Sequence, residues 1–263
     1  MRVNLLKAVL ALFTAAALAF VTLPCVALVL RVPVASLRDA LSQPEALEAL
    51  TLTIKTSALA VAVCVLLGTP AAYLLARVEF RGRELVGSLL NLPMVLPPVV
   101  AGVALLMALG RRGMLGGVLE AFGVELPFTT AAVVIAQAFV GMPYHIQSAR
   151  AGFEAVPRQL EDASRTLGAS DGATFLRVTV PLSWPALACG AILCWGRAVG
   201  EFGATIMFAG NSPGVTRTMP LAILTAMQGD FDDAGALALI LLVFSSVVFV
   251  AGHWLIPRLG RIR

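Results

Sequence analysis

The sequence predicts an all-α membrane protein with six transmembrane helices, in a single domain that covers residues 1–263. Of its residues, 59% are hydrophobic and only 13% are charged, which is too apolar for an ordinary soluble domain. The mean hydropathy of +0.91 agrees with this interpretation. Several apolar runs are also long enough to cross a bilayer, whose hydrocarbon core of about 30 Å needs about 20 helical residues.

Each predicted span is an apolar run that begins and ends near charged or turn-forming residues. The first, residues 8–30, holds 23 residues without a charge and follows Arg2 and Lys7. A signal peptide also starts in this way, but its apolar region is usually only about 7 to 15 residues long. We therefore expect an uncleaved helix. The other spans are expected at residues 52–76, 91–109, 131–151, 184–208 and 234–256.

Prolines interrupt the third span. Pro93, Pro97 and Pro98 remove backbone donors, which a bilayer tolerates only where neighbouring protein or a cavity satisfies the freed carbonyl groups. We therefore expect the start of this helix to face the interior of the bundle.

The fourth and fifth spans carry ionisable residues. His145 lies next to a proline kink and is expected to be a hydrogen-bonded packing residue. Arg197 and Glu201 stand four residues apart on one helix face and should face the bundle interior or water. A salt bridge that positions the helix and a direct role in transport both remain open for this pair.

The connections between the spans differ in composition. Residues 31–50 form a polar connection, and residues 110–130 form a glycine-rich one. The connection at residues 210–233 is long enough for a re-entrant or surface helix that begins near Thr218, Met219 and Pro220.

The basic residues predict the orientation of the chain. Six spans place both termini on one side, and that side carries 12 of the 19 basic residues, whereas the other carries 5 and two, Lys55 and Arg197, lie in or near spans. The positive-inside rule therefore places both termini in the cytoplasm, together with the polar stretch 154–181. The larger set is Arg2, Lys7, Arg77, Arg81, Arg83, Arg150, Arg158, Arg165, Arg177, Arg258, Arg261 and Arg263, and the smaller is Arg31, Arg38, Arg111, Arg112 and Arg217.

The stretch 154–181 is the one long polar passage of the chain, and its first half has the period of an amphipathic helix. Pro157 suits the start of this helix, and Gly168 suits the left-handed residue that follows its end. Ser170 or Asp171 can cap a second short helix, which is expected to stop before Pro181. The apolar stripe is Val156, Leu160, Ala163 and Leu167, and the polar face is Arg158, Glu161, Asp162 and Arg165.

The pattern Asp162-Ala163-Ser164, followed by Gly168 and by an ending at Val178, Val180 and Pro181, resembles the cytoplasmic coupling loop of bacterial ABC-importer permeases. The sequence departs from that signature in having Asp for Glu and Ser for the second Ala. The resemblance implies a six-transmembrane-helix type I ABC-importer permease, whose coupling helix docks on a separate ATPase subunit. The implied ATPase-coupling residues are Arg158, Glu161, Asp162, Ala163, Ser164 and Gly168, with Arg158, Glu161 and Arg165 as the polar docking face.

Residues 200–223 and 91–102 look like the molybdate/tungstate branch of these permeases, to which sulfate permeases are closely related. Neutral donors and one cation could pass a tetrahedral oxyanion without trapping it, although the 210–218 region also suits an ordinary outer loop. The candidate residues of the translocation path are Pro97, Pro98, Arg197, Glu201, Thr205, Asn211 and Arg217.

The sequence argues against several other classes of protein. It has no G-x-x-x-x-G-K-[ST] phosphate loop, so we expect no enzyme activity and no cofactor in this chain, with ATP hydrolysis by a partner. The four cysteines lie in apolar runs without a C-x-x-C pair, and the two histidines lack clustered partners, so neither disulfides nor a metal site is expected. No aromatic-interleaved basic patch indicates nucleic acid.

The resemblance also implies partners and a location. These are two ATP-binding subunits, an extracytoplasmic oxyanion-binding protein, a second copy of the chain, and the lipid of a bacterial or archaeal inner membrane. A sulfate/thiosulfate permease is the alternative within the family. An ion-coupled secondary transporter that uses Arg197, Glu201 and His145 as a relay is the alternative outside it.

Overall fold

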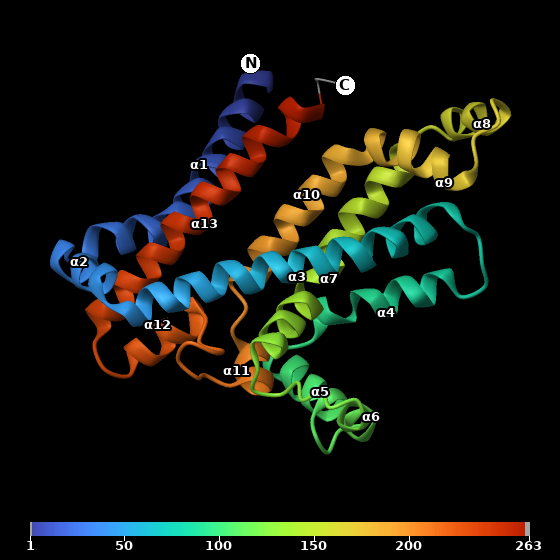
Figure 1. Cartoon of the computed structure of the whole chain (residues 1–263). Coiled ribbons are helices and arrows are strands. Elements are labelled where there is room, and N and C mark those ends of the chain that lie inside the picture. Colours follow the sequence, from blue (N-terminus) through green and yellow to red (C-terminus); the bar gives the residue numbers. More distant parts are fainter. Residues whose placement is uncertain (1, 261–263) are drawn as a thin grey trace.

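The computed structural model describes residues 2–260, and over these residues it is built from helices without a β-strand. Figure 1 shows long helices crossing one another, with short ones at both ends of the bundle. The elements are α1 (Arg2–Arg31), α2 (Val34–Ser42), α3 (Pro44–Arg77), α4 (Arg83–Val95), α5 (Pro98–Leu109), α6 (Gly116–Ala121), α7 (Thr130–Ala155), α8 (Arg158–Thr166), α9 (Asp171–Thr174), a π-helical turn (Phe175–Thr179), α10 (Val180–Val199), α11 (Gly203–Ala209), α12 (Met219–Met227) and α13 (Phe231–Gly260).

Among the described residues, four helical runs are long and apolar enough to cross a membrane, and the bent pair α4–α5 makes up to five. The four lie in α1, in α3, in the continuous run Asp171–Val199 and in α13. α7, the predicted fourth span, is 26 residues long but is not apolar enough to be counted with them. Its position explains this, because α7 packs between α3 and α10 and most of its side chains are buried or partly buried against protein.

Small residues let these central helices approach closely. Gly152 of α7 lies against Ala186 of α10, so that a methyl group at position 152 would overlap the alanine side chain. A methyl group at Gly141 would lie 2.9 Å from Cys194 Sγ, and one at Gly68 of α3 would lie 3.1 Å from His145. Close backbone approach at small residues is the usual way in which membrane helices pack, since lipid offers little hydrophobic drive.

The region of the predicted third span, which prolines were expected to interrupt, is formed by two helices. α4 ends at Val95 and α5 begins at Pro98, with a bend of 116° between them. Leu96 and Pro97 are extended there, because a proline disfavours helical geometry in the residue before it.

The predicted fifth span is also broken. α10 ends at Val199, and α11 begins at Gly203 after a short irregular segment. At its other end this span begins earlier than expected. The helical run that starts at Asp171 continues through Pro181, although the sequence predicted that the helix would stop there. Pro181 is tolerated because it lies in the first turn of α10, directly after the π-helical turn Phe175–Thr179.

Two of the predicted connections contain helices. α2 occupies much of the polar stretch 31–50, and α6 lies in the glycine-rich one. The prediction of a helix in the last connection is confirmed by α12, which begins at Met219 after Thr218 as the N-cap residue.

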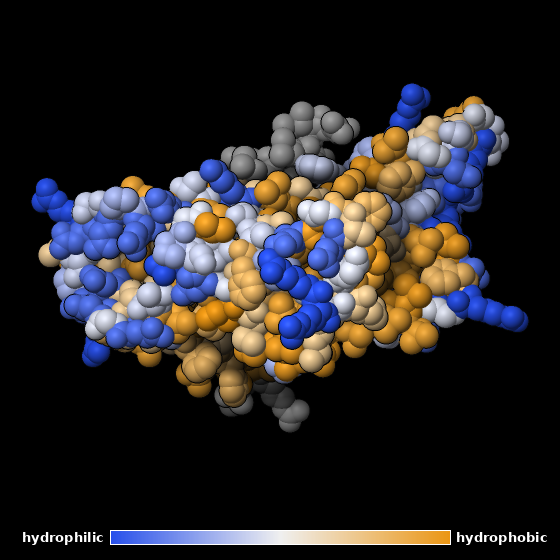
Figure 2. Space-filling model, turned by 60° about the horizontal axis from the view of Figure 1, so that its bottom comes forward, coloured by the Kyte–Doolittle hydropathy of each residue, from blue (hydrophilic) through white to orange (hydrophobic). Residues whose placement is uncertain are grey.

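From Leu6 to Arg31, α1 is almost entirely exposed, and it contacts α13. In Figure 1 the chain ends and the α8–α9 region lie at the top of the view, whereas α2, α11 and α12 lie lower. Figure 2 shows hydrophobic side chains exposed over much of one face, with hydrophilic ones gathered in separate groups. Arg261 and Arg263 of the charge count lie outside the described residues.

Candidate coupling and translocation sites

The polar stretch 154–181 folds into α8 and α9, and we call it the α8–α9 loop. Gly168 follows α8 with φ of +90°, the left-handed conformation that the sequence predicted for this position. Its N–H donates to the Arg165 carbonyl at 2.9 Å. Ser170 caps α9 by accepting a hydrogen bond from Ala173 N at 3.3 Å, which confirms the predicted cap.

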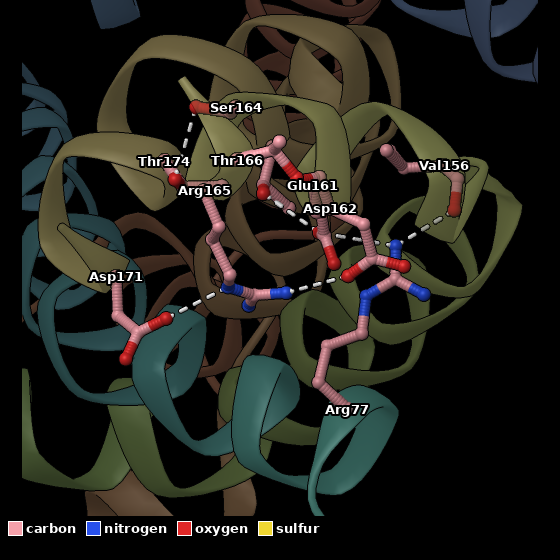
Figure 3. A network of polar contacts seen from close by, with 10 residues as sticks. Arg77, Val156, Glu161, Asp162, Ser164, Arg165, Thr166, Asp171 and Thr174 are labelled. Carbon is pink, nitrogen blue, oxygen red and sulfur yellow. Dashed lines mark hydrogen bonds and ion pairs between the residues drawn. The ribbon is translucent and has the colours of Figure 1, made fainter. Parts of the chain in front are cut away.

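A buried ion pair ties the α8–α9 loop to α3. Arg77 Nη2 lies 3.2 Å from Glu161 Oε1, and the two side chains are only 9% and 4% exposed. The same guanidinium nitrogen donates to the Val156 carbonyl at 2.7 Å, and Thr179 Oγ1 donates to Glu161 Oε1 at 2.8 Å. The contacts of Arg77 are drawn in Figure 3. The C-terminal end of α3, the helix α8 and the π-helical turn that leads into α10 therefore meet at one carboxylate.

The burial of Glu161 corrects the predicted orientation of α8. The sequence placed Glu161 on the polar docking face of the helix and Leu160 and Leu167 on its apolar stripe. In the structure Glu161 is 3% exposed, whereas Leu160 is 46% and Leu167 is 89% exposed. Periodicity defines two faces of a helix but does not say which one meets the protein. Here Arg77 determines that the face with Glu161 is buried, because its buried guanidinium needs a charged partner.

A second network lies on the exposed side of the loop. Arg165 Nε donates to Asp171 Oδ1 at 2.8 Å, and its Nη1 donates to Asp162 Oδ1 at 3.0 Å. The hydrogen bond to Asp171 raises the pKa of the Arg165 guanidinium above its ordinary value. Arg165 is thus engaged within the loop, and Figure 3 shows it lying between its two carboxylate partners.

Ser164, which replaces the second alanine of the signature, has a local role. Its hydroxyl lies 3.0 Å from Thr174 Oγ1 and so joins α8 to α9. Thr174 is only 1% exposed, which makes this a hydrogen bond at the base of the loop. The exposed surface of the loop therefore carries apolar side chains and two basic side chains for which the described residues show no ion pair, namely Leu160, Leu167, Leu176, Arg158 and Arg177.

The two helix breaks lie against each other. A methyl group at Gly203 would lie 2.6 Å from Pro98 Cβ, so the α4–α5 break touches the start of α11. Arg197 Nη2 lies 2.7 Å from Glu201 Oε2, which confirms the predicted pairing. Glu201 is fully buried and its Oε1 accepts a hydrogen bond from Ala204 N at 2.7 Å, as a cap of α11. The structure thus brings Pro97, Pro98, Arg197, Glu201 and the buried Thr205 into one region.

Asn211 and Arg217 belong to a different network. Arg217 Nε donates to Asn211 Oδ1 at 3.1 Å, and Asn211 Nδ2 donates to Thr225 Oγ1 of α12 at 3.0 Å. Arg217 also lies 3.6 Å from Glu45 at the start of α3. Arg217, Glu45 and Thr225 line a cavity of about 200 Å³ between α2, α3, α12 and α13, and neither Asn211 nor Glu201 lines it.

The sequence reasoning missed some polar partners. Arg77 was interpreted only as a topological charge, although an arginine at the end of a span next to an acidic loop is a signal for an ion pair. Asn91 of α4 and Gln147 of α7 were not considered, yet Gln147 Nε2 donates to Asn91 Oδ1 at 3.0 Å. His145 is a buried packing residue as predicted, with Nε2 2.9 Å from Thr69 Oγ1.

Comparison with known proteins agrees with this architecture. A ModB molybdenum transport system permease protein of Mycobacterium tuberculosis is 44% identical over 233 residues, or 89% of this chain and 88% of that protein. The one from Escherichia coli is 40% identical over 226 residues, or 85% of this chain and 98% of that protein.

Solved structures share the fold at low sequence identity. A crystallised bacterial ABC transporter involved in alginate import matches with a TM-score of 0.73 and 18% identity, over 98% of this chain and 96% of that one. The family of inner membrane components of binding-protein-dependent transport systems matches residues 65–261. The chain therefore belongs to this family of binding-protein-dependent transport system inner membrane components.

Proposed function

We propose that this chain is the membrane-spanning permease subunit of an ATP-driven molybdate or tungstate importer. The substrate rests on relatives named molybdenum transport permeases, which align over 85–89% of the chain at 40–44% identity. The single structural observation that carries the mechanism is the anchored α8: a polar helix at the end of the bundle, fixed to two other helices through buried Glu161.

The anchored helix suits the transmission of force. An ATPase that moved α8 would act through Glu161 on Arg77 of α3 and on Thr179 at the start of α10. Both of those helices pack on α7, so a displacement of α8 would reach the centre of the bundle. Glu161 is in this proposal a positioning residue, and Asp162, Ala163, Ser164 and Gly168 shape the helix that docks.

The docking surface consists of the exposed tip of the loop. Leu167 and Leu160 would enter an apolar groove on the ATPase, and Arg158 would meet polar groups at its rim. Gly168 offers a sharp test of this surface. Within the chain no atom lies within 4 Å of a methyl group built there, so a β-carbon at this position meets no neighbour and its cost within the chain comes from the φ of +90°.

The complete assembly would contain a second copy of the chain, two ATP-binding subunits and an extracytoplasmic oxyanion-binding protein. α7 would be a sixth span, shielded from lipid by its neighbours, and the whole chain would form one transmembrane domain. Both termini would lie in the cytoplasm, in agreement with the excess of basic residues, and in Figure 1 the start of α1 and the end of α13 point to the same end of the bundle as α8 and α9. The binding protein would deliver its anion at the opposite end, near Arg217 and Asn211.

The path would pass the two adjoining helix breaks, with Pro97, Pro98, Arg197, Glu201 and Thr205 beside it. Irregular backbone at membrane depth is tolerated where it lines a cavity or is covered by protein. The ion-coupled alternative has less support, because the hydrogen bond of His145 goes to Thr69 and the contacts of Glu201 go to Arg197 and Ala204. Among the described residues these groups do not form a connected relay.

The deciding experiment measures ATP hydrolysis by the chain reconstituted with its ATPase and binding protein, comparing molybdate, tungstate and sulfate. Stimulation by molybdate or tungstate, but not by sulfate, is the expected result. Stimulation by sulfate alone would identify sulfate as the substrate. Uptake by the purified chain without ATP would instead indicate a secondary transporter. Gly168→Trp should abolish stimulation and ATPase binding, whereas Gly168→Ala, the matched control, should retain both. Equal behaviour of the two variants would contradict the docking surface.

A further inference from the structure

A polar stripe is exposed on α7, in the half of the helix nearer the α8–α9 loop. Tyr144, Gln147, Ala151 and Glu154 recur at steps of three, four and three residues, so they share one face. Gln147, Ala151 and Glu154 are exposed and Tyr144 is partly exposed. We call these four residues the α7 stripe. They contrast with the apolar side chains that the neighbouring α4 exposes, such as Leu89 at 52%.

Polar groups of α4 complete the α7 stripe. Gln147 Nε2 donates to Asn91 Oδ1 at 3.0 Å, which joins the two helices through their amides. Closer to the α8–α9 loop, Glu154 Oε1 accepts from Arg150 Nε at 2.8 Å and lies 3.7 Å from Arg83 Nη2. Two arginines thus share one carboxylate, and this part of the seam keeps a net positive charge.

The amide pair lies at membrane depth. A methyl group at Gly190 would lie 2.9 Å from Ser148 Cβ and 3.1 Å from the His145 carbonyl, so the residues on both sides of Gln147 lie against Gly190. Gly190 is near the middle of α10 (Val180–Val199), within a run apolar enough to cross a membrane. An amide that faced hydrocarbon there would lose its hydration without full compensation, which is unfavourable. Polar groups at such depth face protein or water.

We infer that the α7 stripe and Asn91 line the cytoplasmic half of the oxyanion path, and that Asn91 and Gln147 contact the passing anion. This inference rests on the proposed function, which supplies the anion. Neutral amide N–H groups can donate to the oxygens of a tetrahedral oxyanion, but they form no ion pair that would retain it. Arg150 and Arg83 lie nearer the cytoplasm, and their positive potential draws the anion from the amides toward the cytoplasm.

The test measures water access by cysteine labelling of the complete transporter in inverted membrane vesicles. Exposed Cys25 and Cys189 are first replaced by Ser, while buried Cys64 and Cys194 remain, and the labelling of this parent is subtracted. Gln147→Cys is then treated with a charged, membrane-impermeant methanethiosulfonate, and Ala151→Cys provides a small exposed exchange in case the first variant folds poorly. Leu89→Cys is the matched control, because Leu89 lies two residues before Asn91 and is exposed on the apolar side of α4.

We expect cysteines at positions 147 and 151 to react at least about tenfold faster than one at 89, because each unit by which apolar surroundings raise a thiol pKa removes about 90% of the reactive thiolate. Molybdate should slow the reaction at 147. Equal rates at all three positions, no reaction at 147 and 151, or reaction at 147 that molybdate leaves unchanged would each overturn the inference. The labelling rates of the three cysteines do not depend on transport. The ATPase measurement therefore tests the identity of the substrate separately from the water access of the path.

Discussion

The buried pair of Arg77 and Glu161 allows a quantitative prediction about the stability of the chain. Glu161→Ala leaves the guanidinium of Arg77, 9% exposed, with the Val156 carbonyl as its remaining partner, and it removes the acceptor of Thr179 Oγ1. Breaking one side of a buried pair typically costs about 3 to 5 kcal/mol of unfolding free energy. Replacing both charges with apolar groups of similar size is often neutral, so Arg77→Met with Glu161→Leu should cost far less than the sum of the two single changes.

The measurement is a double-mutant cycle on the purified chain, unfolded in mixed micelles by increasing dodecyl sulfate and followed by tryptophan fluorescence. Arg77→Met, Glu161→Leu and the double variant are compared with the unchanged chain. We expect a coupling energy of at least about 2 kcal/mol between the two positions, since the side chains are in contact. Additive costs, or a Glu161→Ala variant that loses less than about 1 kcal/mol, would refute the view that this pair anchors α8.

Three further predictions concern the packing of α10 and the geometry of the α8–α9 loop. Gly190→Ala should destabilise the chain by about 1 to 3 kcal/mol, because the new methyl group meets Ser148 Cβ at 2.9 Å. Gly196→Ala in the same helix meets no atom within 4 Å and should be neutral or stabilising by about 0.5 to 1 kcal/mol. Thermal unfolding of both variants checks this prediction, and equal shifts in their unfolding temperatures would contradict it. Ser164→Ala should cost about 1 kcal/mol through loss of the hydrogen bond to Thr174 while leaving the helical circular dichroism unchanged, and a variant as stable as the parent would show that this bond contributes nothing. Gly168→Ala should lower the unfolding free energy by about 1 to 2 kcal/mol because of the φ of +90° at this position, since the new methyl group meets no atom within 4 Å. Asparagine tolerates this backbone conformation better than alanine, so Gly168→Asn should be the less destabilised variant in the same unfolding assay.

Local signals in the sequence were sufficient for most of the helices. Long apolar runs predicted α1, α3 and α13, because a helix that contacts lipid must be apolar. Turn chemistry predicted the end of α8 at Gly168 and the cap of α9 at Ser170. These features depend on residues close together in the chain, so a reading of the sequence alone can find them.

The helix breaks were less accessible to such reasoning. Prolines at 97 and 98 indicated a disturbance, but a bend of 116° also requires α5 to find a partner, which it does in α11 beside Gly203. Pro181 shows the reverse case: the same residue type was predicted to stop a helix, and the π-helical turn before it allowed the helix to continue. A proline removes one donor, and the surrounding structure decides whether that loss ends the helix.

By itself the sequence determined that this chain is a bundle of apolar helices with one amphipathic polar loop, because hydropathy, helical period and turn residues are properties of neighbouring residues. Only the tertiary structure decided which face of α8 is buried and which polar groups meet. Arg77 and Glu161 are far apart in the sequence, as are Asn91 and Gln147, and each pair is joined by a single contact between helices. Such contacts depend on how the helices cross and rotate about one another, and that is determined by close packing at small residues such as Gly152 and Gly190.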